Sequence, residues 1–328
     1  LKDKKVLVTG ADGFIGSHLL EHLVLEGADV TAFIFYNSFN SWGWLDSLPK
    51  ETLEKIDIFS GDIRDPNGVR MAMEDCQIVF HLAALIGIPF SYHSPDSYID
   101  TNVKGTLNVL QAAKDLQLER VLVTSTSEVY GSAKKLPINE EHSLKAQSPY
   151  SASKIAADNL ALSYYNSFDL PVKVIRPFNT FGPRQSARAI IPTIISQTLN
   201  NNKSIKLGNL DVGRDFTYVN DLCKAFDDIS KSSKFFGEVV NVGNNKMVTV
   251  RELIKIIFDL IGKEKEIIQE EIRIRKKGSE VENLMADNLK FIKLSNWKPE
   301  TNLTAGITKT INWMIENKEK FNKSIYYV

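Results

Sequence analysis

The chain of 328 residues is long enough for one large domain or two ordinary ones, and either can bury a core without disulfides or metals. Its 43% hydrophobic and 24% charged residues are typical of a globular protein and exclude disordered, collagenous and coiled-coil chains. Lys plus Arg and Asp plus Glu both number 40, and this neutral balance argues against general nucleic-acid binding.

Apolar strands alternate with helices from the first residues to about residue 178. Continuously apolar strands are typical of a parallel sheet that is buried on both faces. The alternation therefore predicts an α/β fold, a doubly wound parallel sheet of the Rossmann type, with a dinucleotide-binding domain over residues 1–178. The strands are expected at 5–9, 29–35, 56–59, 77–82, 120–124 and 172–176, and the helices at 15–24, 66–74, 101–116 and 151–168.

The pattern changes after Pro177. Thr249 and Glu252 form a capping box, which predicts the start of a helix. Residues 179–328 are expected to form a smaller α+β substrate lobe that exchanges segments with the first domain. Its helices are expected at 190–200, 249–261 and 303–317, with a strand at 239–242 and an exposed strand within 264–277.

Signals for metals, membranes and secretion are missing from the sequence. Cys76 and Cys223 have no near partner, and no Cys/His cluster exists, so we expect no metal site. The longest apolar run, 78–90, is too short and too interrupted to span a bilayer. No secretory signal precedes the first strand, so we expect a cytoplasmic protein with no membrane or nucleic-acid partner.

Three glycines predict a dinucleotide site. Gly10, Gly13 and Gly16 follow the first strand and open the first helix. Glycine is needed where backbone approaches a pyrophosphate, and the start of the helix supplies free N–H groups for it. The strand at 29–35 then ends in Tyr36, Asn37 and Ser38, without the acidic residue typical of NAD sites or the arginine typical of NADP sites.

The missing arginine favours NAD, with Asn37 or Ser38 as the ribose contact. Asp62 follows the third strand, where it is expected either to bind the adenine amino group or to stabilise its own loop.

A tyrosine and a lysine predict hydride-transfer chemistry. Tyr150 and Lys154 lie four residues apart on a predicted helix and so share one face. An ammonium beside a phenol lowers the pKa of the phenol, which suits a base that takes a proton from an alcohol. Thr126 follows a strand end and is expected to hydrogen-bond the substrate hydroxyl. His81 is expected to be structural rather than an acid or base.

Together these residues resemble the extended short-chain dehydrogenases/reductases, and within them the nucleotide-sugar epimerases and 4,6-dehydratases. The resemblance implies a tightly held nicotinamide cofactor that is reduced and reoxidised within one turnover. It also implies a homodimer joined through a four-helix bundle. The motifs that carry it are residues 9–16, 81–84, 102–106, 150–154, 176–179, 214–221 and 241–243.

The expected cofactor contacts combine the glycine loop, the strand ends and the Tyr/Lys pair. They are Gly10, Asp12, Gly13, Phe14, Ile15, Tyr36, Asn37, Ser38, Asp62, Ile63, Leu82, Ala83, Ala84, Asn102, Thr124, Tyr150 and Lys154.

Glu128 bears on which reaction the chain catalyses. The 4,6-dehydratases have Thr-Asp-Glu where this chain has Thr126, Ser127 and Glu128. In that family the glutamate takes the C5 proton and the aspartate protonates the leaving hydroxyl, whereas epimerases carry a small residue in place of the glutamate. Here either Ser127 relays a proton or Glu128 performs both transfers.

We therefore rank a 4,6-dehydratase first and an epimerase or a UDP-glucuronate decarboxylase as alternatives. The decarboxylases resemble residues 125–131 but typically read Tyr-Asp-Glu-Gly-Lys where this chain has Tyr-Ser-Ala-Ser-Lys at 150–154. A non-catalytic dinucleotide-binding protein is disfavoured because Tyr150 and Lys154 are both present.

Cations in the C-terminal half predict a nucleotide diphosphate ligand, since arginine suits phosphate recognition. Where the family usually has one more arginine, this chain offers Lys277 or Arg275. Stretches 36–44, 84–92 and 181–192 resemble the dehydratases of legionaminic acid pathways, which implies GDP- or UDP-N-acetylglucosamine as substrate. The expected substrate contacts are Ile86, Arg176, Asn179, Arg184, Arg188, Arg214 and Lys277.

Overall fold

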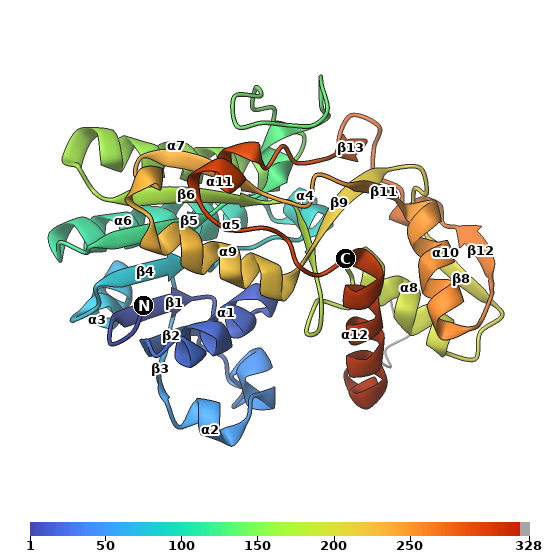
Figure 1. Ribbon diagram of the computed structural model, residues 1–328, viewed down its shortest axis with the longest axis horizontal. Helices are drawn as coiled ribbons and strands as arrows, with labels where there is room; N and C mark the ends of the chain where they lie inside the picture. Colours follow the sequence, from blue (N-terminus) through green and yellow to red (C-terminus); the bar gives the residue numbers. More distant parts are fainter. Residues whose placement is uncertain (322–328) are drawn as a thin grey trace.

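The computed structural model describes residues 1–321, and its centre is a seven-stranded parallel sheet with the order β10-β6-β5-β4-β1-β2-β3 (Figure 1). The sheet confirms the predicted doubly wound α/β fold. Its strands are β1 Lys5–Thr9, β2 Asp29–Phe35, β3 Ile56–Gly61, β4 Ile78–His81, β5 Arg120–Thr124, β6 Val172–Pro177 and β10 Glu238–Val242.

Helices cover both faces of this sheet because alternate strand residues point to opposite sides. Val6 and Val8 of β1 pack with α1 Phe14–Leu25 and α9 Val219–Lys231, whereas Leu7 packs on the opposite face. The helices of that second face are α3 Pro66–Met73, α6 Gly105–Asp115 and α7 Pro149–Phe168. The helix predicted at 101–116 starts differently, because 99–104 form a π-helical turn before α6.

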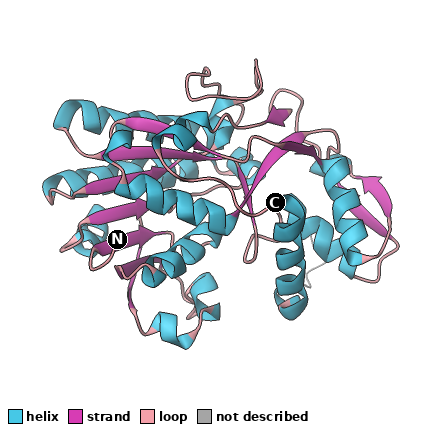
Figure 2. Cartoon of the chain, in the orientation of Figure 1, coloured by secondary structure: helices cyan, strands magenta, loops and turns pink. Residues whose placement is uncertain are grey.

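The C-terminal lobe is built from small sheets and helices (Figure 2). A four-stranded sheet pairs β9 Gly213–Tyr218 with β7 Asn179–Phe181, β11 Met247–Thr249 and β13 Asn283–Leu284. A second sheet pairs β8 Ser204–Leu207 with the exposed strand β12 Glu266–Gln269. The remaining helices are α8 Ile190–Leu199, α10 Val250–Ile261, α11 Leu289–Leu294 and α12 Leu303–Glu316, and short helices α2 Lys50–Leu53, α4 Ile88–His93 and α5 Pro95–Tyr98 lie in the first half.

One segment of the C-terminal half lies with the large sheet. β10 pairs in parallel with β6, and α9 packs against α1. Residues 219–242 are therefore packed with the seven-stranded sheet, although they follow residue 178. The domain division at residue 178 stays a prediction. The last seven residues of the predicted lobe lie outside the described part of the chain.

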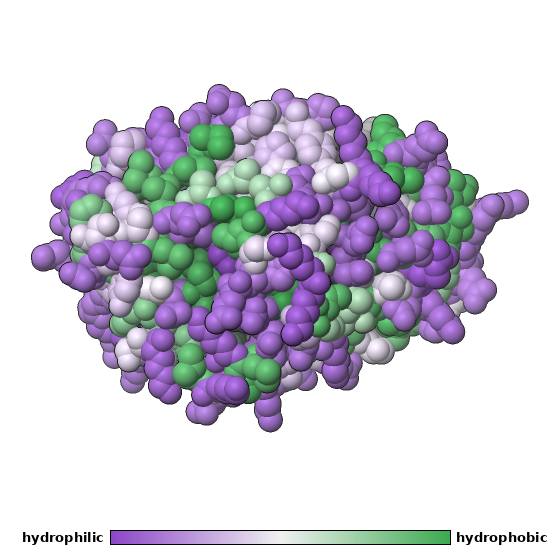
Figure 3. Space-filling view, turned by 90° about the horizontal axis from the view of Figure 1, so that it is seen from above, coloured by the Kyte–Doolittle hydropathy of each residue, from purple (hydrophilic) through white to green (hydrophobic). Residues whose placement is uncertain are grey.

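The face of the molecule seen from above carries mainly hydrophilic side chains (Figure 3). Hydrophilic side chains cover most of the face in Figure 3, with smaller hydrophobic areas between them. Over residues 1–321, none of the helices has the length and hydropathy to cross a bilayer.

Candidate active site

The glycine loop between β1 and α1 fits a dinucleotide. Gly10 has φ +70°, and a Cβ there would lie 2.8 Å from the backbone nitrogen of Ala83. A Cβ on Gly16 would lie 2.1 Å from the carbonyl oxygen of Gly10. Gly13 caps α1 without a side chain, so Phe14 and Ile15 begin the helix with uncapped N–H groups. This leaves room and donors for a pyrophosphate.

A hydrogen-bond chain fixes the ends of β1 and β4. Thr106 Oγ1 donates to the carbonyl of Asn102 at 2.6 Å and so accepts from His81 Nε2 at 3.0 Å. His81 Nδ1 then accepts from Thr9 Oγ1 at 2.8 Å, and that oxygen accepts in turn from the backbone N–H groups of 82–83. Burial lowers the pKa of His81 to about 3. These contacts give His81 the predicted structural role.

Asn102 holds the loop that follows β4. Its Oδ1 accepts from the backbone nitrogen of Leu85 at 2.8 Å, and its Nδ2 donates to the carbonyl of Leu85 and to Ser153 Oγ, both at 2.9 Å. All of these bonds are internal, and they fix the backbone at Leu85, directly after residues 82–84.

The end of β2 is exposed. Tyr36 is 68% exposed and Ser38 is also exposed. Asn37 instead uses both ends of its amide within its own loop, since Nδ2 donates to the carbonyl of Ser41 at 2.8 Å and Oδ1 accepts from the nitrogen of Phe39 at 3.0 Å. Of the two predicted ribose contacts, Ser38 is the one without such internal bonds among those described.

Two carboxylates lie near the proposed dinucleotide site, one after β3 and one in the glycine loop. Asp62 pairs with Arg64, and the hydrogen bond from Arg64 lowers the pKa of Asp62. These contacts match the alternative in which Asp62 stabilises its own loop. Ile63, the next residue, is buried. Asp12 lies in the glycine loop, where burial raises the pKa of its side chain. Its backbone carbonyl accepts from the nitrogen of Trp44 at 3.0 Å.

The structure brings the predicted catalytic residues together where β5 meets α7. Lys154 Nζ donates to the carbonyl of Thr124 at 2.6 Å, and burial lowers the pKa of Lys154 to about 8. Burial raises the pKa of Tyr150, whereas a hydrogen bond with the Thr126 side chain lowers it and the charge of Glu128 raises it. The phenol, the hydroxyl and the carboxylate therefore share one site.

The backbone around Glu128 is fixed on both sides. Its nitrogen donates to Thr126 Oγ1 at 3.2 Å, and its carbonyl accepts from Ser151 Oγ at 2.8 Å. The short 3-10 helix Ser127–Tyr130 starts here, and Ser127 itself is only 3% exposed. The backbone that carries the Glu128 carboxylate is thus held in a hydrogen-bonded turn beside the first turn of α7.

A buried ion pair, Asp158 with Arg176, contacts Ser125 just before this turn. Asp158 Oδ2 accepts from Ser125 Oγ at 2.8 Å and pairs with Arg176 Nη2 at 2.9 Å. Arg176 also donates to the hydroxyl of Tyr130 at 3.0 Å and is only 3% exposed. Arg176 was predicted to bind substrate, but the contacts of its guanidinium are internal.

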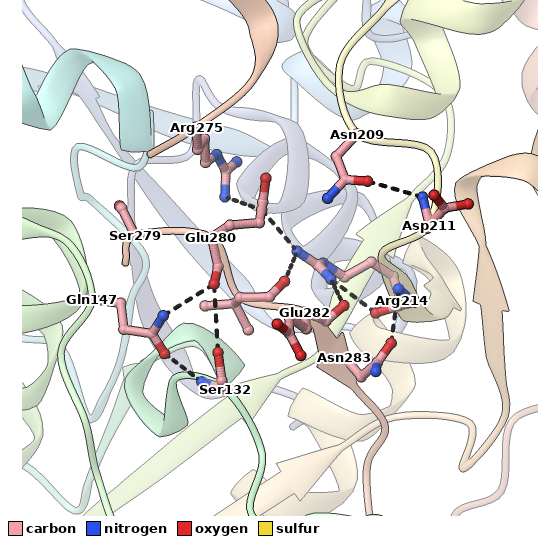
Figure 4. A network of polar contacts seen from close by, with 12 residues as sticks. Ser132, Gln147, Asn209, Asp211, Arg214, Arg275, Ser279, Glu280, Glu282 and Asn283 are labelled. Atoms are coloured by element: carbon pink, nitrogen blue, oxygen red, sulfur yellow. Dashed lines mark hydrogen bonds and ion pairs between the residues drawn. The ribbon is translucent and has the colours of Figure 1, made fainter. Parts of the chain in front are cut away.

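Arg214 lies on β9, and Figure 4 shows the polar contacts around it. Its guanidinium donates to the carbonyls of Gly213, Val281 and Glu282 at 2.7–3.0 Å, so three of its bonds are internal. Burial lowers the pKa of Arg214, and the charges of Glu128 and Glu280 raise it. Arg214 therefore lies within electrostatic reach of both carboxylates.

The other predicted substrate residues occupy varied positions. Arg184 pairs with Glu21 of α1, and Asn179 Oδ1 is buried without a hydrogen-bond partner in residues 1–321. Arg188 is exposed; burial raises the pKa of Tyr98, and the charge of Arg188 acts against that rise. The remaining two, Ile86 and Lys277, are exposed.

Sequence reasoning missed three residues of the site. The ring of Tyr98 lies 6.2 Å from that of Tyr150, Asp158 sits one turn beyond Lys154, and Glu280 faces Arg214. The four-residue spacing from Lys154 to Asp158 was a usable signal. Nothing in the sequence relates Glu280 to Arg214.

Comparisons with known proteins fit this geometry. The family model described as GDP-mannose 4,6 dehydratase matches residues 7–310. The human dTDP-D-glucose 4,6-dehydratase is 31% identical over 96% of this chain and 91% of its own. A UDP-N-acetylglucosamine 4-epimerase from Methanobrevibacter ruminantium has a TM-score of 0.86 at 30% identity, covering 97% of this chain and 100% of its own.

A cofactor is present in a further solved relative. The dTDP-glucose 4,6-dehydratase from Streptomyces venezuelae, solved with NAD bound, has a TM-score of 0.86 at 27% identity, covering 97% of this chain and 99% of its own. Its cofactor is the one that the sequence predicted here. Relatives of this chain thus include both dehydratases and epimerases.

Proposed function

Because this chain belongs to the GDP-mannose 4,6-dehydratase family of extended short-chain dehydrogenases, we propose that it is an NAD-dependent nucleotide-sugar 4,6-dehydratase, a hydro-lyase. The observation that carries the proposal is the position of Glu128, in a hydrogen-bonded turn beside Tyr150 and Thr126. An epimerase needs no carboxylate at this point, because it only oxidises C4, lets the ketose turn and reduces it again.

The proposed mechanism uses the residues at the end of β5 and the start of α7. Tyr150 takes the proton of the C4 hydroxyl, Thr126 hydrogen-bonds the same hydroxyl, and the ammonium of Lys154 favours the phenolate. Bound NAD, held at the glycine loop, would supply a hydride acceptor for C4 and a hydride donor for C6. C5 gains a proton in that last step, which the proton that Tyr150 took from the C4 hydroxyl balances.

Glu128 then removes the C5 proton that the C4 ketone has acidified. The C6 hydroxyl leaves as water with the proton that Glu128 has just gained, which forms the C5–C6 double bond. One carboxylate serves both transfers because the elimination needs a base first and an acid second. Ser127 as a proton relay is the alternative assignment.

The proposed substrate is GDP- or UDP-N-acetylglucosamine, as in dehydratases of the legionaminic acid type. The structural relative named as a UDP-N-acetylglucosamine 4-epimerase supports the sugar class. Arg184, Arg188, Arg214 and Lys277 are proposed to face the diphosphate, with Asn179 and Ile86 toward the rest of the substrate.

We also propose a cytoplasmic homodimer. The exposed Leu107 of α6 and Phe168 of α7 support a dimer built on these two neighbouring helices. The free Cys76 and Cys223 support a reducing compartment. Sedimentation of the full chain tests the dimer directly.

The proposed activity is tested by mass spectrometry of nucleotide sugars incubated with the purified protein without added cofactor. Loss of one water from GDP- or UDP-N-acetylglucosamine is expected, and it also identifies the base. An unchanged mass with a new sugar by NMR would indicate an epimerase. Loss of carbon dioxide from UDP-glucuronate would indicate a decarboxylase.

Two variants assign the proton transfers. Glu128→Gln is expected to retain bound NAD and C4 oxidation but to lose water elimination. Ser127→Ala is the matched control, since it keeps Glu128 and is expected to dehydrate the sugar. Full turnover by Glu128→Gln would contradict the assigned base, and loss of dehydration in Ser127→Ala alone would favour the relay.

A further inference from the structure

Two arginines share one carboxylate at the edge of the site. Glu280 Oε1 lies 3.7 Å from Arg214 Nη2 and 3.6 Å from Arg275 Nη1 (Figure 4). Both distances exceed those of hydrogen bonds, so charge alone holds the carboxylate there. Arg275 Nη1 is buried and has no hydrogen-bond partner among the described residues. The Glu280 carboxylate thus lies near two cations, and one buried donor of Arg275 is left without a hydrogen bond among the described residues.

The loop that carries Glu280 is fixed through its backbone. The carbonyl of Glu280 accepts from Gln147 Nε2 at 3.1 Å and from Ser132 Oγ at 3.4 Å. Gln147 Nε2 also donates to the carbonyl of Gly278, and the Tyr92 hydroxyl bonds to Ser279 Oγ. The Glu280 side chain can therefore turn away while the loop stays in place.

We propose that the Glu280 carboxylate stands in for the substrate's diphosphate between Arg214 and Arg275 and is displaced when a nucleoside diphosphate binds. This inference rests on the proposed function, since it takes the ligand to be a nucleotide sugar. A diphosphate brings more charge and more acceptor oxygens than one carboxylate, and guanidinium groups bind phosphate oxygens in pairs. Glu280 therefore competes with the substrate and sets its affinity.

The charge balance of the neighbourhood agrees with this role. Glu128 and Glu280 both act on Arg214, so the two carboxylates match Arg214 and Arg275 in number. Displacing the Glu280 carboxylate leaves a net positive site for the diphosphate and keeps Glu128 for chemistry. A like charge held beside a bound phosphate costs affinity.

The test compares the affinity of UDP and GDP for the wild type, Glu280→Gln and Glu282→Gln by titration calorimetry on the full chain. Glu282 is the matched control, because it is exposed on the same loop and its carboxylate makes no ion pair within residues 1–321. Glu280→Gln is expected to bind one of the two nucleotides roughly tenfold more tightly, and Glu282→Gln within about twofold of the wild type.

Further outcomes separate this inference from the proposed function. Glu280→Ala must show a gain of the same sign, which covers the case in which the Gln variant fails to fold. An affinity that is unchanged or weaker in both Glu280 variants means a structural ion pair and overturns the inference, even if the wild type dehydrates a nucleotide sugar. A gain without turnover of any nucleotide sugar overturns the dehydratase proposal alone. No binding of UDP or GDP by any form overturns both.

Discussion

At the residue scale, the proposed chemistry of the site rests on the buried pair Tyr150 and Lys154. Burial alone disfavours both charged forms, because it raises the pKa of the phenol and lowers that of the amine. The hydrogen bond from Thr126 and the charge of Asp158 act in the opposite direction, the first on Tyr150 and the second on Lys154. The site therefore depends on Lys154 keeping its proton.

The pKa of about 8 for Lys154 predicts a pH effect. In the proposed mechanism the Lys154 ammonium favours the phenolate. This ammonium is present below about pH 8 and is lost as the pH rises through that value. Turnover is therefore expected to fall on the alkaline side of about pH 8. Lys154→Arg keeps its charge to higher pH and should move this decline upward, whereas Lys154→Met should lose roughly 10²–10⁴-fold of the rate.

The measurement is kcat against pH for the wild type and both variants. An alkaline decline that stays in place in Lys154→Arg would show that another group titrates there.

Element by element, the apolar strands were the predictable part of the fold. β1 and β2 follow from apolar runs, and α1 follows from apolar residues at helical spacing between glycines. β9 was missed because Arg214 and Asp215 interrupt its pattern, although both are buried. The partners of Asp215 are backbone N–H groups at 244–245 and 286, which only the folded chain brings together.

A buried lysine joins two elements of the large sheet layer. Lys173 of β6 is fully buried, and its ammonium donates to the carbonyls of Ile229, Ser230 and Ser232 at 2.7–2.8 Å. These groups end α9, where a positive charge is favourable. The contact fixes α9 against the sheet.

Lys173→Met should therefore destabilise the protein by about 2–4 kcal/mol, since it leaves buried carbonyls without a donor. Lys231→Met is the control, because its half-exposed ion pair with Asp227 on the same helix is worth at most about 1 kcal/mol. Urea unfolding of both variants measures the difference. Equal losses would mean that the carbonyls find water in place of Lys173.

For the whole molecule, sequence spacing could predict contacts within an element but not between lobes. Tyr150 and Lys154 were found because one helix carries both. Glu280 reaches Arg214 only because β13 pairs with β9, which sets Asn283 beside Gly213. Likewise, β10 returns to the edge of the first sheet after a long excursion through the second lobe, and no local pattern indicates that return.

One contact between the lobes involves Trp44, which also bonds to the glycine loop. The ring of Trp44 meets that of Trp313 on α12 at 5.4 Å in an edge-to-face arrangement. The same loop presses on the glycine loop, because Trp44 donates its N–H to the carbonyl of Asp12 and a Cβ on Gly43 would lie 2.7 Å from that oxygen. The C-terminal lobe is thereby coupled to the proposed NAD site.

Trp313→Ala should therefore weaken NAD retention. An aromatic pair contributes about 0.5–1.5 kcal/mol, which limits the loss of NAD affinity to about tenfold. Trp42→Ala is the control, since Trp42 lies in the same loop but is 42% exposed. The NAD content of the purified variants and NAD titration of the apo forms measure the effect. If Trp313→Ala lowers the melting temperature while its NAD affinity equals that of Trp42→Ala, the pair stabilises the fold without coupling the lobes to the cofactor.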